Sequence, residues 1–278
     1  MKPICLAIIM MSCVSVFARN IELLNSDDQQ TLDKLEVLQW CSKISEKDEC
    51  FVTNALTSSK DSIAEAALCV AIVHDIRGLK DQIQQGVGPS NGYCRLLSNL
   101  VVDGFEKKQS PIESLMRSSL LKDVPNQLRE KANHFIAVFV ARKYRGGEVP
   151  KINLNGLEFS SLDQKILQYS KLSSKDVVAD VIGKLRQAEV AGANEYDLVR
   201  VLNSYEGVAI DDILNPLQDK EGTTVYGKML LLSAIDGQIS KMTAAEKQRT
   251  LSALRCMKRD EKQVERMFRR VEKRLENN

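Results

Sequence analysis

Cysteine and histidine are the residue types of this chain best suited to metal, redox or nucleophilic chemistry. The sequence holds seven cysteines and two histidines, His74 and His134. Neither histidine has a ligand-spaced partner and no Cys-x-x-Cys pair occurs, so no metal site is expected. Asp75 follows His74, but adjacent helical residues point about 100° apart, which is poor geometry for a base and its orienting carboxylate. We expect His74 to cap a helix C-terminus and His134 to be a packed side chain.

No motif of a known reaction class is present. The chain lacks the nucleophile-elbow, phosphate-loop and zinc-protease patterns. Residues 86–89 (Gly-Val-Gly-Pro) are too short to hold a phosphate and predict a turn, and Asp211-Asp212 predicts the first turn of a helix. We therefore expect no enzyme, no catalytic residue and no cofactor. A hydrolase of cell-envelope polymers that uses two carboxylates is the alternative, because such a pair leaves no motif.

The N-terminus predicts a signal peptide over residues 1–18. Lys2 precedes an apolar run at 4–14, and Val16 and Ala18 supply small residues for cleavage after Ala18. A lipoprotein signal ending at Cys13 fits less well because Met-Met-Ser precedes it, and a membrane anchor would need about 20 apolar residues. We expect an exported bacterial protein, periplasmic or secreted, with no transmembrane segment after cleavage.

Export makes disulfides the expected state of the cysteines in the N-terminal third. The candidates are Cys41, Cys50, Cys69 and Cys94. Pairing Cys41 with Cys50 and Cys69 with Cys94 joins neighbouring elements, although four cysteines allow three pairings. Buried free thiols are the alternative. Cys256 is the odd cysteine; basic neighbours would favour its thiolate if it were exposed, so it is either a free thiol or a small packing residue.

Helix signals recur along the whole chain and predict an all-α fold of about 12 to 14 short helices. Capping boxes begin at Ser62 and Thr243, and Ser110 precedes a proline suited to a first helical position. Looser starts lie at Ser26, Ser173 and Asn194. The apolar stripes include Leu198, Val201, Leu202 and Tyr205, and also Ile166, Tyr169 and Leu172. The expected helix stops are Gly78, Gly86, Gly146, Gly192, Gly207 and Gly237.

One stretch interrupts the helical pattern. Residues 147–160 contain Gly-Glu-Val-Pro and few helix formers, which predicts a non-helical hinge or linker. This stretch would divide the mature chain into a helical part at 19–146 that contains the disulfides and a helical part at 161–278.

Internal similarity suggests repeated helix pairs. Residues 195–207 align with 225–237 at an offset of 30, and 64–78 align with 132–146 at an offset of 68. Helices such as 63–74, followed by Asp75-Ile-Arg-Gly78, resemble those of HEAT-like α-solenoid repeats. The resemblance implies stacked helix pairs that form a curved, partner-binding scaffold without inherited catalytic residues. An irregular multi-helix bundle is the alternative.

The C-terminal segment is locally basic. Residues 241–278 hold twelve Lys or Arg and six Asp or Glu, which is a local net charge of +6. The net charge of the whole chain is +2. Its last helix would bury Val264, Met267, Phe268, Val271 and Leu275. The opposite side carries the partner-binding candidates Lys262, Arg266, Arg269, Arg270 and Lys273. A capping helix with a polar outer face accounts for this pattern as well.

Together these patterns favour a non-enzymatic scaffold that binds a protein or peptide partner. Apolar residues make up 44% of the chain, which excludes a disordered protein. The near-neutral charge gives no general case for a nucleic-acid partner. Binding of nucleic acid or an anionic surface through the basic C-terminal helix is a further alternative, and the last helix could make such a surface contact weakly.

Overall fold

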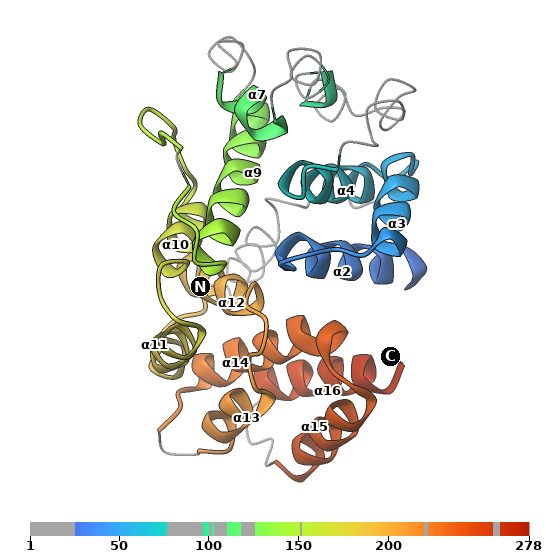
Figure 1. Cartoon of the computed structure of the whole chain (residues 1–278). Helices are drawn as coiled ribbons and strands as arrows, with labels where there is room; N and C mark the ends of the chain where they lie inside the picture. The colour runs from blue at the N-terminus through green and yellow to red at the C-terminus, as the bar shows by residue number, and fades with distance from the viewer. Residues whose placement is uncertain are drawn as a thin grey trace, which may run out of the picture.

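The computed structural model describes residues 26–76, 97–99, 102, 110–117, 126–150, 152–219, 222–257 and 262–277. In this part of the chain the regular structure is helical and no strand occurs, so the predicted all-α class is confirmed. Figure 1 shows the arrangement. The N-terminal helices are α2 (Ser26–Trp40), α3 (Glu46–Leu56), α4 (Asp61–Val73), α7 (Pro111–Arg117) and α9 (Asn126–Arg145). The C-terminal helices are α10 (Ser161–Tyr169), α11 (Ser174–Arg186), α12 (Ala193–Asn203), α13 (Ile210–Gln218), α14 (Val225–Gln238), η2 (Ile239–Lys241), α15 (Ala244–Cys256) and α16 (Lys262–Asn277).

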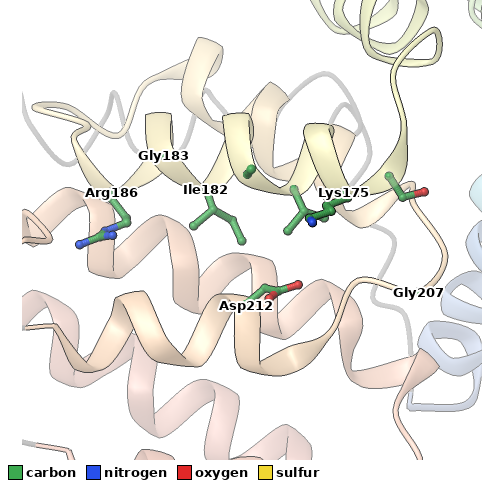
Figure 2. Close-up of a pocket in the computed structure, with 9 residues that line it drawn as sticks. Lys175, Ile182, Gly183, Arg186, Gly207 and Asp212 are labelled. Atoms are coloured by element: carbon green, nitrogen blue, oxygen red, sulfur yellow. The ribbon is translucent and has the colours of Figure 1, made fainter.

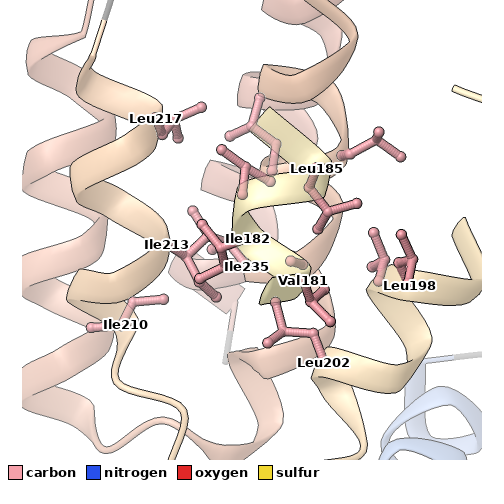
Figure 3. Packing of buried hydrophobic residues seen from close by; sticks show 14 of the residues in the cluster. Val181, Ile182, Leu185, Leu198, Leu202, Ile210, Ile213, Leu217 and Ile235 are labelled. Carbon is pink, nitrogen blue, oxygen red and sulfur yellow. The ribbon is translucent and has the colours of Figure 1, made fainter. Parts of the chain in front are cut away.

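The C-terminal helices form two rows. In one row α10, α12, α14 and α16 pack each against the next, and in the other α11, α13 and α15 do the same. Figure 3 shows the core between the rows, where Val181 and Leu185 of α11 meet Leu202 of α12 and Ile213 of α13. Leu202 and Leu232, aligned by the offset of 30, are both fully buried.

A second core lies among the N-terminal helices. Leu35, Leu68 and Ile136, from α2, α4 and α9, are fully buried in it. Residues 146–160 contain no helix where the structure describes them, and Ile152 and Leu157 pack back against this N-terminal core. The non-helical stretch is thus anchored on one side.

The first and last described helices touch each other. Arg274 of α16 pairs with Asp33 of α2 at 2.8 Å, and α2 also contacts η2. Trp40, at the end of α2, packs against both cores. In Figure 1 the red α16 lies beneath the blue α2. The two ends of the described chain therefore share an interface.

Several predicted helix starts are confirmed. Thr243 and Glu246 form a capping box, and the Ser173 side chain accepts from the Asp176 N–H. Ser110 caps α7, which begins at Pro111. These caps need residues only three apart in sequence, which is why the sequence is sufficient to find them.

Two predicted starts are wrong. Helix α4 begins at Asp61, before the expected Ser62 cap, and Glu65 pairs with Lys131 of α9 instead. Helix α12 is capped at Gly192 rather than Asn194, with the Glu195 carboxylate accepting from the Gly192 N–H at 3.1 Å. In the first case a contact with a neighbouring helix draws the carboxylate away from the cap.

Some of the predicted glycine stops are confirmed and others are wrong. Gly146 and Gly207 follow helix ends, as expected, whereas Gly192 starts a helix and Gly237 lies inside α14. A Cβ at Gly237 would fall 1.9 Å from the side-chain amide nitrogen of Asn203, so the Asn203 side chain on α12 occupies the space that a larger residue would need. Gly78 and Gly86 lie outside the described residues.

The described cysteines are free thiols. Cys41 is partly buried, donates to the Val37 carbonyl oxygen at 3.3 Å and makes no bridge with the exposed Cys50. The expected Cys41–Cys50 disulfide is therefore not formed in this structure. Cys69 is free and buried in α4, while its expected partner Cys94 lies outside the described residues, as does the predicted signal peptide. Cys256 is a free and exposed thiol at the end of α15.

Candidate functional site

One cavity among the described residues lies where the C-terminal ends of several helices meet. It has a volume of about 960 Å³, and we name it the helix-end cleft. The ends of α2, α4, α9, α10 and α12 contribute to its walls. Its lining includes Trp40, Lys43, His74, Asp75, Arg142, Lys143, Tyr144, Arg145, Glu148, Lys171, Leu172, Tyr205 and Glu206.

Arg142 joins the ends of three helices at the cleft. Its guanidinium donates to the Cys41 carbonyl oxygen at 2.6 Å and to the Val73 carbonyl oxygen at 2.7 Å. These carbonyls lie at the ends of α2 and α4, and Arg142 itself belongs to α9. Carbonyls at a helix C-terminus lack partners within the helix and carry partial negative charge, so a cation stabilises them. The Arg142 guanidinium thus links the ends of α2 and α4 to α9 in the wall of the cleft.

His74 caps α4, as predicted, and makes two further contacts that the sequence did not show. Its Nε2–H donates to the Leu38 carbonyl oxygen at 2.8 Å, so Nδ1 is left to accept from Arg142 at 3.2 Å. Burial, reinforced by the Arg142 charge, lowers the pKa of His74 to about 4. The imidazole is therefore neutral at physiological pH and bridges α2, α4 and α9.

Arg145 occupies the centre of the interface between the two cores. Its guanidinium carbon lies 3.7 Å from the centre of the Tyr205 ring and 4.7 Å from that of Trp40. It also donates to the Ser204 carbonyl oxygen at 2.7 Å and to the Ser204 hydroxyl at 2.8 Å. Planar stacking combined with a forked donor set is characteristic of arginine and unavailable to lysine. The end of α9 is thereby fixed to the end of α12.

A lysine from η2 also donates to carbonyl oxygens at the end of α12. Lys241 donates to the carbonyl oxygens of Asn203 and Tyr205, the latter at 3.3 Å. Burial lowers the pKa of Lys241 to about 8 against the opposing effect of Glu206. Burial, reinforced by the nearby Glu206 carboxylate, raises the pKa of Cys41 to about 11, so this thiol is protonated at neutral pH and is a poor nucleophile.

Other side chains of the cleft face solvent. Lys43 and Lys171 are exposed, and no ion pair of theirs occurs in the described part of the chain. Leu172, predicted to belong to a buried stripe, is 46% exposed, because α10 ends at Tyr169 and Leu172 lies in the following turn. The sequence carried no signal that this leucine reaches a cleft.

A second, smaller groove of about 570 Å³ runs between α11 and the start of α13. Figure 2 shows Ile182 and Gly183 of α11 above Asp212 of α13, with Lys175 and Arg186 along the same helix. Arg186 is paired with Asp219 at 2.5 Å. Asp212 is the one carboxylate among the described residues of this lining.

The predicted basic face of α16 is exposed. Val264, Phe268, Val271 and Leu275 are buried against the C-terminal core and Met267 is partly buried against it, so the predicted apolar stripe is confirmed. On the opposite side Arg269 pairs with Glu265 at 2.6 Å and Arg270 with Asp236 at 3.1 Å. Lys262, Arg266 and Lys273 are exposed, with no ion pair among the described residues. None of the five lines either cavity.

His134 has a carboxylate partner that its sequence neighbours did not reveal. Its Nδ1 lies 2.7 Å from a carboxylate oxygen of Asp163, which is buried at the start of α10. The other Asp163 oxygen accepts from Ser160, the cap of that helix, at 2.7 Å. Because the serine contacts the aspartate and not the imidazole, these three residues are not arranged as a nucleophile and its base. The contact joins α9 to α10.

Among the described residues no three His, Cys, Asp or Glu side chains gather closely enough to hold a metal ion. None of the described helices combines the length and apolar composition needed to cross a membrane. Comparison of the chain with protein-family models, curated proteins and solved structures finds no match.

Proposed function

We propose that this protein is a non-enzymatic helical scaffold that acts after export and binds a segment of another protein in the helix-end cleft. The observation that carries the proposal is a cleft of about 960 Å³ whose buried cationic side chains donate hydrogen bonds to backbone carbonyl oxygens of the protein itself. Of the lining residues, Arg142 and Arg145 donate to carbonyl oxygens at helix ends, and His74 is neutral. Such groups make a rigid wall, which reduces the entropy lost on binding.

The cleft also offers apolar contact area. Leu172 is exposed, and the aromatic rings of Tyr144 and Phe139 also line the cavity. Ligand sites are concave and combine apolar side chains with polar groups, and both kinds of side chain line this cleft. A volume of this size suits several residues of a peptide.

The scaffold itself is proposed to be a short α-solenoid. The two helix rows at residues 161–277 support this architecture. Hydrogen bonds of recurring length in sequence support it too: His74 to Leu38, Tyr205 to Tyr169 and Thr224 to Ala188 each span 36 residues. Repeats that stack make contacts at such a regular separation. Small-angle scattering tests the shape, because a compact bundle of about 260 residues has a radius of gyration near 18 Å and a solenoid a larger one.

Site-specific cross-linking tests the binding function. A photoreactive residue at position 172 is compared with one at Val190, which is exposed to a similar degree but lines neither cavity. We expect a protein adduct from position 172 alone, and excess unmodified protein should suppress it whereas excess Leu172→Asp should not. Equal labelling at both positions, or hydrolysis of envelope polymers by the purified protein, would contradict the proposal.

A further inference from the structure

The charges around the helix-end cleft are unbalanced. Five cationic side chains line it, from Lys43, Arg142, Lys143, Arg145 and Lys171, against three acidic ones, from Asp75, Glu148 and Glu206. The whole chain is close to neutral, with 39 basic and 37 acidic residues. The cleft therefore concentrates positive charge locally, and a concave site does so more effectively than a flat surface.

Only part of this charge is available to a ligand. Arg142 and Arg145 donate to helix-end carbonyls, and Lys143 pairs with Glu148 at 2.8 Å. Lys43 and Lys171 are exposed and have no ion pair within the described residues. These two lysines come from different elements, the α2–α3 loop and the α10–α11 turn. A ligand that contacts both lysines therefore touches two separate elements of the cleft wall.

Apolar surface adjoins these free lysines. Leu172 follows Lys171 directly, and the Lys171 ammonium lies 5.6 Å from the centre of the Tyr144 ring on α9. The turn after α10 therefore faces the end of α9, with a leucine, a tyrosine and a lysine together. Such a site favours a ligand that presents an apolar side chain next to a negative charge.

We infer that the segment bound in the cleft is acidic, with carboxylates that pair with Lys43 and Lys171 around one apolar anchor that contacts Leu172 and Tyr144. This inference rests on the proposed function and specifies the chemistry of its ligand. Pairing between exposed charges is weak and salt-sensitive, so binding should weaken as ionic strength rises. The apolar anchor should supply a part of the affinity that salt does not remove.

The protein carries its own probe for this test. Trp40 is the single tryptophan of the chain and lines the cleft, so its fluorescence reports occupancy there. Three tryptophan-free peptides are titrated, each with a central phenylalanine: one rich in glutamate, one with glutamine in place of glutamate, and one with lysine. We expect the glutamate peptide to bind at least about tenfold more tightly than the other two, and more weakly at high salt.

Matched variants locate the site. The double variant Lys43→Glu and Lys171→Glu should weaken binding of the glutamate peptide by about tenfold or more. The control, Lys262→Glu with Lys273→Glu, makes the same charge change on exposed lysines of α16 and should leave the affinity unaltered. All four lysines are exposed, and equal unfolding temperatures for the two variants would establish that the fold is retained.

Each contrary outcome has its own meaning. Equal binding of the glutamate and glutamine peptides would overturn the acidic ligand but leave a peptide-binding cleft. Loss of binding only in the α16 variant would move the acidic partner to the basic C-terminal helix. Absence of any Trp40 response, together with no adduct at position 172, would overturn both the ligand chemistry and the proposed function.

Discussion

The Arg145 guanidinium lies 3.7 Å from the centre of the Tyr205 ring, at the point where the two hydrophobic cores of the chain meet. The Trp40 ring flanks it at 4.7 Å, so residues from α2, α9 and the α12–α13 loop share one stack. This contact, the Asp33–Arg274 pair and the His134–Asp163 contact between α9 and α10 join the N-terminal helices to the C-terminal rows. Because the helix-end cleft lies along the same junction, its shape should depend on Arg145.

Arg145→Lys should destabilise the fold by about 1–3 kcal/mol, because lysine keeps the charge but loses the stacking and the forked bonds to Ser204. Denaturant unfolding followed by Trp40 fluorescence measures this, and native emission should shift as well. Arg129→Lys is the matched control on the same helix, where the side-chain hydrogen bond of the arginine within the described residues is with Asn126. An equal effect of both substitutions would argue against the stack.

The pH dependence of stability should reveal the neutral His74. Its pKa is lowered to about 4 in the folded protein, by burial first and then by Arg142. The unfolded chain, with a pKa near 6.5, binds the proton more readily between these values, so stability is retained above pH 6.5 and lost as pH falls toward 4. We expect a loss of about 1–2 kcal/mol, less than the full shift because the ring is partly exposed.

Unfolding free energies at pH 7 and pH 5 measure this loss. His74→Gln, which cannot titrate, should flatten the dependence in this range, and His134→Gln should keep it. A slope that disappears in His134→Gln instead would assign the effect to the other histidine.

Two helix ends of the same geometry offer an internal comparison. After α4 the residue in the left-handed conformation is Asp75 with φ 53°, and after α9 it is Gly147 with φ 78°. In both turns the next residue donates back to the helix: Ile76 to the Ala71 carbonyl oxygen and Glu148 to the Lys143 carbonyl oxygen. This arrangement favours glycine.

Asp75→Gly should therefore stabilise the protein by up to about 1 kcal/mol, and Gly147→Ala should destabilise it by about 1 kcal/mol. Thermal unfolding of the two variants is the measurement. If Asp75→Gly lowers stability, the carboxylate contributes more at the cleft than its backbone strain costs.

Two glycines within helices should respond in opposite ways to alanine. A Cβ at Gly227 would lie 2.6 Å from the Arg186 carbonyl oxygen and 2.8 Å from that of Leu185, where α14 meets the end of α11. Gly227→Ala should cost about 1–3 kcal/mol because backbone must move. Gly183→Ala meets nothing within 4 Å and should stabilise α11 by about 0.5–1 kcal/mol. Chemical denaturation distinguishes the two, and similar losses would contradict the close packing at Gly227.

Thiol labelling tests the state of the cysteines. Cys50 and Cys256 are exposed and free, so both should react with a maleimide in the native protein without reduction. Cys69, which is buried, should react only after unfolding, and Cys41 slowly because its thiol pKa is raised to about 11. Mass spectrometry of the labelled peptides reads the result. If Cys50 reacted only after a reductant was added, the result would support the Cys41–Cys50 disulfide that the sequence predicted.

Features that depend on nearby residues could be read from the sequence. The all-α class, the caps at Ser173 and Thr243 and the buried stripe of α16 follow from patterns within one or two helical turns. In two places where those expectations fail, a distant residue intervenes. Glu65 contacts Lys131 rather than its own helix start, and Gly237 makes room for Asn203 rather than ending a helix.

Local sequence patterns did not predict the helix-end cleft. Its walls bring together Trp40, Arg145 and Tyr205, and the pair that joins the ends of the fold, Asp33 and Arg274, is separated by 241 residues. Local periodicity specifies which face of a helix is buried but not which helix will cover it, because that choice depends on the packing of all the others. The sequence by itself determined the helices, the caps and the apolar faces. The tertiary structure alone decided that five helix ends converge, that arginines occupy them, and that Leu172 and two lysines are left facing solvent in a cleft.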